Sequence, residues 1–123
     1  MTVTVLSYQD GMASIASVAG NITGYWMDKT KPERKTYSVE INIPSTYRFC
    51  DFHPVQGQID AIVKNAEGHS VIGKVTAYEE GIVFLSISND LIMIEVVPDH
   101  RFYAFVGQYV SLLVHKIELF RTD

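Results

Sequence analysis

Four histidines and a single cysteine are the side chains of this sequence that best suit metal or nucleophilic chemistry. The histidines (His53, His69, His100 and His115) form neither a His-x-His nor a His-x-x-x-His pair, and only Cys50 and His53 lie close together. Zinc needs three or four nitrogen, sulfur or oxygen ligands that converge on the ion. Residues three apart in an extended loop point apart. We therefore expect no metal site, and a buried or partly buried free thiol at Cys50.

Other catalytic patterns are equally weak. A cysteine nucleophile needs a base within hydrogen-bond reach, and nothing in the sequence selects a histidine for that role. An aspartate that caps a short helical turn explains Asp99-His100-Arg101, and a solvated turn explains Glu79-Glu80. Neither Gly-x-Gly-x-x-Gly nor Gly-x-x-x-x-Gly-Lys, the phosphate-binding patterns, occurs. We expect neither an enzyme nor a cofactor.

Aromatic and basic residues gather in one region of the chain. Tyr25 and Trp26 directly precede the basic stretch MDKTKPERK, and STYRFCDF follows it. Aromatic faces beside Lys and Arg bind single strands by base stacking and by neutralising phosphates. One alternative function is therefore an OB-like single-stranded nucleic-acid-binding protein. It would use Tyr25, Trp26, Lys29, Lys31, Arg34 and Lys35.

The overall charge favours a different partner. The net charge is −4, and residues 36–123 hold 6 Lys and Arg against 11 Asp and Glu. An acidic chain is poorly suited to phosphate contacts, so nucleic acid is disfavoured and a basic protein is the expected partner. Acidic side chains on turns would steer such a partner, and aromatic rings would anchor it. The candidate partner-binding residues are Glu79, Glu80, Asp60, Glu67, Asp90, Tyr47 and Phe49.

These features predict a non-enzymatic protein-binding module. One form of it is an inhibitor that occludes a basic partner such as a toxin, and the chain resembles immunity proteins in size and charge only. A third class is a structural or assembly subunit joined through an exposed strand edge, which would make the protein a homo-oligomer.

The length and composition predict one domain over residues 1–123. Apolar residues make up 47% of the chain and charged residues 20%, as in ordinary globular proteins. The N-terminal stretch has no basic leader, and no run approaches the roughly 18 apolar residues of a membrane span. A single cysteine fits a reducing compartment. We therefore expect a cytoplasmic protein that is not in a membrane.

Alternating patterns predict an antiparallel meander. Residues 36–43 place Tyr37, Val39, Ile41 and Ile43 on one side of a strand. Residues 58–64 and 70–78 read as a hairpin, and short turns lead to strands at 82–88 and 91–97. Residues 10–20 fit a short helix or a strand equally well, and a strand follows at 22–27. A helical turn after Asp99 would bury Phe102, Tyr103 and Phe105.

The last apolar stretch, residues 107–120, decides the expected fold. Val110, Leu112 and Val114 share one face, whereas Ile117 and Leu119 have the opposite parity. A bulge at residues 115–116 of one long strand would return both groups to one face. Such a strand, with about seven short strands, predicts an all-β fold with one or two short helices, namely a small antiparallel barrel or sandwich with an OB-like Greek-key barrel preferred. Glycines before three strands have unequal spacing, so we expect no internal repeat.

Overall fold

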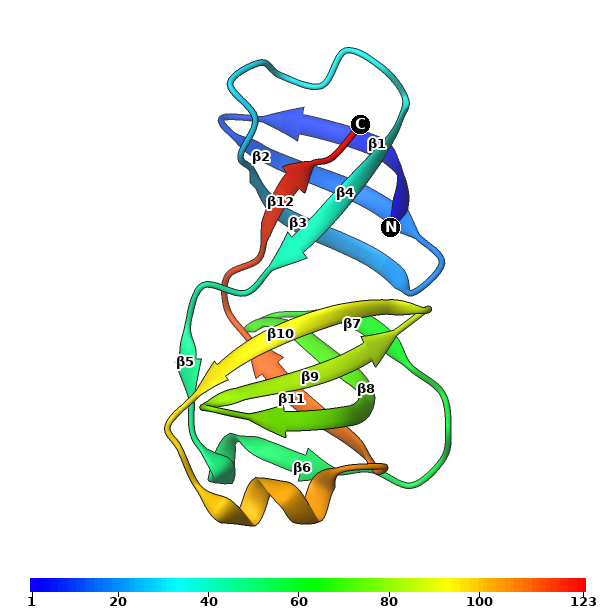
Figure 1. The fold of residues 1–123 in the computed structure, drawn as a ribbon. Helices are drawn as coiled ribbons and strands as arrows, with labels where there is room; N and C mark the ends of the chain where they lie inside the picture. The colour runs from blue at the N-terminus through cyan, green and yellow to red at the C-terminus, as the bar shows by residue number, and fades with distance from the viewer.

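The computed structural model describes every residue from Met1 to Asp123, and strands dominate it (Figure 1). Its first strands are β1 (Thr2–Gln9), β2 (Met12–Ser17), β3 (Gly20–Trp26), β4 (Thr36–Asn42), β5 (Thr46–Tyr47), β6 (Phe52–Pro54) and β7 (Ala61–Asn65). They are followed by β8 (Gly68–Glu79), β9 (Ile82–Ile87), β10 (Asp90–Val96), β11 (Tyr109–Val114) and β12 (Glu118–Arg121). Two 3-10 helices, η1 (Phe49–Asp51) and η2 (His100–Phe105), complete the chain. The prediction of a small all-β barrel fold is confirmed.

The first barrel is closed, with the strand order β1-β2-β3-β12-β4. Tight turns join β1, β2 and β3 into a meander, and β4 pairs antiparallel with β1. β12 lies between β3 and β4, parallel to the former and antiparallel to the latter. Because the last strand enters between the third and the fourth, the barrel is a five-stranded Greek key, the preferred shape from the sequence.

The remaining strands form a curled sheet with the order β5-β10-β9-β8-β11-β6, and β7 adds to β8. β5 and β6 lie at opposite ends of this order although only η1 and its flanking residues separate them in the chain. The sheet must therefore bend until its two ends approach each other. Figure 1 shows it stacked below the first barrel.

The curled sheet repeats the unit that builds the first barrel, so the expectation of no internal repeat is wrong. β8, β9 and β10 correspond to β1, β2 and β3 with a constant difference in residue number, 75 − 5 = 70. The first strand of each unit has an irregularity at the same place, between Val5 and Ser7 and between Val75 and Ala77. A shared bulge at matching positions identifies equivalent strands, because bulges are specific features of a fold.

The turn after each first strand is also repeated. Asp10 and Gly11 have φ angles of 51° and 83°, and Glu80 and Gly81 have 50° and 80°. Two central residues with positive φ give the turn that matches the twist of a hairpin. Both units carry the sequence pattern Val-x-x-Tyr-x-x-Gly, at residues 5–11 and 75–81. The repeat is therefore visible in the sequence once the structure fixes its spacing.

Each unit receives its closing strand from the other half of the chain. β12 follows β11 of the curled sheet but closes the first barrel, whereas β5 and β6 follow β4 of the first barrel and lie against β10 and β11. The registers agree: Leu119 pairs with Trp26, and Tyr47 pairs with Val96, again 70 positions on from Trp26. The two halves have therefore exchanged closing strands.

This exchange corrects the interpretation of residues 107–120. They do not form one bulged strand, since β11 belongs to the curled sheet and β12 to the first barrel. His115 and Lys116 lie in the connection, where the chain passes from one sheet to the other. Val114 and Ile117 are both buried, so the change of parity in the sequence is real. Its cause is the crossover between two sheets.

Two local expectations have different outcomes. Residues 10–20 contain no helix: β2 alternates, with Ala13 and Ile15 in the core, because the turn at residues 10–11 sets a hairpin. The helical turn near Asp99 is present as η2, and the Asp99 side chain accepts a hydrogen bond from the Arg101 amide. Phe102 is buried as expected, whereas Tyr103 is 60% exposed. None of the helical segments is long and apolar enough to span a membrane.

The two sheets meet along β3 and β7. The Ile62 amide donates to the Ala19 carbonyl oxygen at 2.9 Å. A Cβ atom on Gly20 would lie 2.2 Å from the Ile62 carbonyl oxygen, so no other residue fits at position 20 without a backbone shift. A single cluster of 29 buried side chains extends through both sheets. The junction is therefore close backbone packing with a continuous core.

A buried histidine adds a polar contact at this junction. His69 on β8 is 5% exposed, and its Nε2 accepts a hydrogen bond from the Thr23 amide of β3 at 3.1 Å. Nearby, Lys64 Nζ donates to Thr23 Oγ1 at 2.9 Å. Burial, with a smaller contribution from the Lys64 charge, lowers the pKa of His69. The neutral imidazole is the form that can accept this hydrogen bond.

Exchanged closing strands predict that the two halves of the chain fold only together. A cut between Gly57 and Gln58, in the exposed loop before β7, separates the first barrel from β12 and the curled sheet from β5 and β6. We expect fragments 1–57 and 58–123 to be unfolded alone and to fold as a one-to-one complex when mixed. Circular dichroism and thermal melts of each fragment and of the mixture measure this. A cooperative melt of either fragment alone would contradict the exchange.

The histidine contact predicts a loss of stability in mild acid. The folded-state pKa of His69 lies below the ordinary value of about 6.5, so the unfolded chain binds the extra proton first. The stabilisation is fully present above pH 6.5 and is lost as the pH falls through the lowered folded pKa. Urea unfolding of the wild type and of His69→Gln at pH 7.5 and pH 5.5 measures it. The variant should lose less stability than the wild type, and equal losses would show that His69 is not the group responsible.

Candidate functional site

A groove runs between the two sheets on the face where β10 of the curled sheet approaches β4 and β12 of the first barrel (Figure 1). It consists of two adjoining depressions, of about 260 Å³ and 390 Å³, which share Glu40, Ile41 and Leu91. The other residues that line it are Met1, Val39, Asn42, Asp90, Ile92, Met93, Phe120 and Thr122. We call this the front groove.

Strand alternation explains why large apolar side chains line the front groove. Alternate residues of β10 point into the curled sheet, and Ile92 and Ile94 are buried there. Leu91 and Met93 face outward and are 55% and 54% exposed. Phe120, on the outer face of β12, is 40% exposed. Three large apolar side chains in one groove indicate a contact surface for another molecule.

Carboxylates surround these apolar side chains. Glu40 lines both depressions, and Asp90 lines one of them. Glu95 shares the outward face of β10 with Met93, and Glu118 is the neighbour of Asn42 in the β12–β4 pairing. No lysine or arginine lines either depression. The front groove therefore presents an apolar floor with carboxylates around it, of which Asp90 lies 3.4 Å from the Met1 ammonium and Glu118 lies 3.8 Å from Lys116 Nζ.

The acidic residues that the sequence selected do not gather at this site. Asp90 lines the front groove, but the Glu79-Glu80 turn lies at the opposite end of the β9–β10 hairpin, since Asp90 pairs with Ile87 and Glu95 pairs with Ile82. The carboxylate of Asp60 accepts a hydrogen bond from the Ser88 amide. Glu67 sits in the β7–β8 turn, where its carbonyl oxygen accepts from His115 Nδ1 at 2.8 Å. These side chains thus face several directions.

The two predicted aromatic anchors are part of the fold. Tyr47 is 8% exposed and belongs to the core. Phe49 stacks on Phe105 with ring centroids 4.8 Å apart, and the Arg101 guanidinium lies over the Phe49 ring, 4.3 Å from its centroid. Neither ring projects freely toward a partner.

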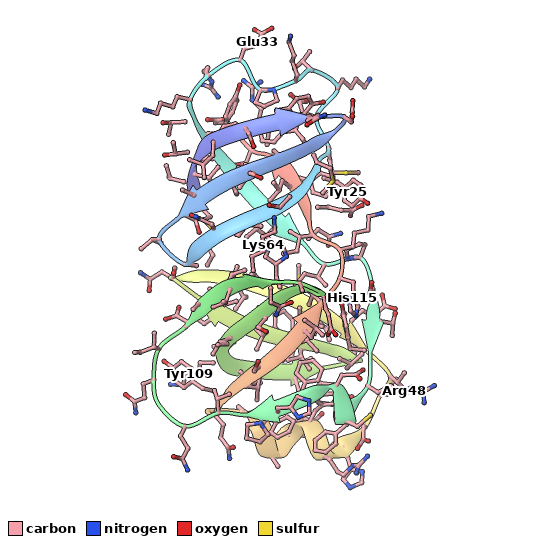
Figure 2. All side chains as sticks on the ribbon, turned by 180° about the vertical axis from the view of Figure 1, so that it is seen from behind. Tyr25, Glu33, Arg48, Lys64, Tyr109 and His115 are labelled. Carbon is pink, nitrogen blue, oxygen red and sulfur yellow. The ribbon has the colours of Figure 1, made fainter.

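Of the residues predicted to bind nucleic acid, some lie in the core and others on the surface. Trp26 is 6% exposed, packs edge-on against Tyr37 at 5.0 Å, and donates from Nε1 to the Thr30 carbonyl oxygen at 2.8 Å. Its face is therefore unavailable for stacking with a base. Tyr25 is 42% exposed, and Lys116 Nζ lies 4.8 Å from its ring centroid. Figure 2 shows Tyr25 on the first barrel, far from Arg48 of the curled sheet.

The basic loop at residues 27–35 connects β3 to β4 and is mostly exposed. Lys29, Lys31 and Lys35 are exposed, whereas Arg34 Nη2 lies 2.9 Å from Asp123 Oδ1. The hydrogen bond to Tyr37, followed by the Asp123 charge, raises the pKa of Arg34. The loop thus offers lysines, but its arginine is already paired.

Cys50 is exposed, which corrects the expectation of a buried or partly buried thiol. It is the middle residue of η1 and lies in a depression of about 500 Å³ that also includes Asp51, His53 and His115. No group of three or more His, Cys, Asp and Glu side chains could hold a metal ion.

A wider depression, of about 710 Å³, lies beside η2. Asp99 and Arg101 form an ion pair there at 2.7 Å, and hydrogen bonds from Arg101 lower the pKa of Asp99 to about 2. These two charges neutralise each other, which leaves Glu80 as the unpaired carboxylate of this depression.

The sequence analysis missed Leu91, Met93 and Phe120. A signal for the first two is present, because the stretch LIMIEVV has apolar residues in both phases of its alternation. A strand of a small barrel needs only one apolar face. The outward apolar phase at residues 91 and 93 is therefore the signal in the sequence for the exposed side chains of the front groove.

Comparisons with known proteins add no relative to this description. No protein-family model matches the chain, and no curated protein or solved structure matches it either.

Proposed function

We propose that this protein is a non-enzymatic protein-binding module that takes a basic partner in the front groove. One observation carries the proposal: Leu91, Met93 and Phe120 line a groove that is surrounded by carboxylates, and the one cationic group lining it, the Met1 ammonium, is paired with Asp90. A partner with apolar and basic side chains complements both properties.

The apolar floor would supply most of the affinity. Removing apolar surface from water is worth about 25 cal/mol per Å². The unbranched Met93 side chain adapts its shape to a partner, and the ring of Phe120 offers a flat contact surface. Such residues at the centre of an interface commonly dominate its binding energy.

The carboxylates would supply selectivity and speed of association. Glu40 lies in the groove and forms no ion pair, Asp90 beside it is paired with the Met1 ammonium, and the whole chain has a net charge of −4. Negative potential in a concave site steers cationic partners and repels acidic ones. Two copies of this chain placed groove to groove would bring like charges together, so the charge favours a different, basic protein over self-assembly.

An inhibitor of the immunity type fits this chemistry. Toxins that act on nucleic acid need a basic surface for phosphates, and an acidic module that covers such a surface blocks substrate access without any reaction of its own. The nucleic-acid-binding alternative has less support, since Trp26 is buried and Arg34 is paired with Asp123.

Capture of a partner on matched columns tests this proposal. One column carries the wild type, a second carries Leu91→Asp with Met93→Asp, and a third carries Val18→Asp, which changes an 84% exposed apolar residue on the β2–β3 turn. We expect a basic protein to bind the first and third columns, and the groove variant to lose at least about tenfold in affinity, or about 1.4 kcal/mol.

A charge comparison separates the front groove from the acidic turn. Glu40→Lys should weaken the same partner, whereas Glu79→Lys with Glu80→Lys should not, although it changes more charge. Titration calorimetry with the captured protein measures both. If the turn variant weakens binding and the groove variants do not, the interface lies at residues 79–80. If the captured partner is acidic or is a nucleic acid, the proposal fails.

A further inference from the structure

Because the two halves are repeats, the front groove has an equivalent position on the opposite side of the molecule, which we call the second place. The front groove lies between β10 and the pair β4 and β12, and Met1, directly before β1, lines one of its two depressions. The counterparts of β10, β4 and β1 are β3, β11 and β8. The corresponding place therefore lies between β3 and β11, and Figure 2 views the molecule from that side.

The chain itself fills this second place. Val71 pairs with Leu112 of β11 as Met1 pairs with Val39 of β4, so Val71 is the counterpart of Met1. β8 begins three residues before Val71, at Gly68. His69 pairs with Val114 and Ser70 pairs with Leu113 on the edge of β11. β7 then adds to β8 and contacts β3, and Lys64 lies at the junction of the two sheets in Figure 2. A hairpin of residues 61–70 thus occupies the space between the sheets.

The same edge is open in the front groove. The Val39 amide of β4 donates to the Met1 carbonyl oxygen at 2.8 Å, and the N-terminal ammonium of Met1 donates to the Val39 carbonyl oxygen at 3.0 Å. In an antiparallel ladder every second residue points to the same side, so Ile41 is the next residue of β4 with its amide and carbonyl directed toward this side. Its counterpart Val114 pairs with His69. Within residues 1–123, no strand pairs with Ile41 on this side, because β1 pairs with β4 only through residues 36–39.

We propose that the partner in the front groove binds as an extended strand that pairs with β4 at Ile41, in line with β1. This inference rests on the proposed function and adds the conformation of the bound segment. Backbone hydrogen bonds to a free strand edge provide affinity, and pockets for alternate side chains provide specificity. Side chains of the added strand would contact Leu91 and Met93, whose counterparts at the filled place are Asn21 and Thr23.

This difference in side chains defines the chemistry of the occupant. At the filled place, polar β3 residues receive His69 and Lys64 from the hairpin. In the front groove, Leu91 and Met93 require apolar side chains on the strand, and Glu40, which unlike Asp90 is not ion-paired, favours lysine or arginine beside them. The occupant is therefore an extended segment with apolar and basic residues.

An N-terminal extension of the full chain tests whether the groove accepts a strand. A copy of residues 58–70, QIDAIVKNAEGHS, is placed directly before Met1, which is the counterpart of Val71. Tethering gives the segment a millimolar effective concentration, so weak pairing is detectable. We expect hydrogen exchange of the Ile41 amide to slow by at least about tenfold. The matched control carries His69→Pro within the copy, which removes the donor that faces Ile41 and should abolish the protection.

A second extension, with Asp60→Lys and Glu67→Lys within the copy, tests the charge requirement separately. Protection of Ile41 by either extension, lost in the proline control, supports the strand site. Stronger protection by the lysine version supports a basic occupant as well. Equal protection by both versions keeps the strand site and removes the charge argument of the proposed function. If Ile41 exchanges equally fast in all versions, the strand site is overturned, whereas capture of a basic partner by the groove would still stand.

Discussion

The exchange of closing strands is the constraint on which the rest of the structure depends. β12 completes the first barrel, and the segment of β5 and β6 completes the curled sheet, yet each is encoded beside the other sheet. Neither sheet can finish its hydrogen bonding without crossing to its neighbour, so the two cannot separate as independent bodies. The close approach of Gly20 to Ile62 follows from this arrangement, because two crossing connections pull the sheets together. Contacts between residues far apart in sequence dominate, and such topologies fold slowly.

The front groove is a product of the same constraint. The first barrel and the curled sheet, packed against each other, leave a hollow on each face of their junction. On one face the β7–β8 hairpin fills the hollow, with His69 buried and hydrogen-bonded to Thr23. On the other face, Leu91, Met93 and Phe120 remain exposed although they are the kind of residue that a core buries. The front groove that we propose as the binding site is therefore a feature of the junction between the two sheets.

Sequence reasoning predicted the elements better than their assembly. The strand at 36–42 follows from clean alternation, those at 68–79, 82–87 and 90–96 follow from apolar stretches between short turns, and the barrel class follows from the number of strands. The break near His115 was detected from parity, but a bulge and a crossover leave the same signature in one strand, so only the partner strands distinguish them. For the site, the acidic net charge led to the expectation of a basic partner. The selected acidic residues lie on different faces of the molecule, because the position of a residue on a turn does not determine which other side chains it lies beside. Trp26 and Tyr47 were candidates for a surface, and both pack in the core.

One hollow is filled and the other is not, which bears on how the two halves of the chain arose and on how many partners it would bind. Equal bulges and equal turns in the two halves are the mark of a duplicated half-length unit, and two such units with exchanged strands form a symmetric pair. In a symmetric pair both hollows would be alike. The segment between the units, residues 55–67, occurs once, and it has broken that symmetry by occupying one hollow with the chain's own hairpin. Residues 1–123 thus leave one of the two hollows unfilled, so the partner that we propose would bind in a ratio of one to one.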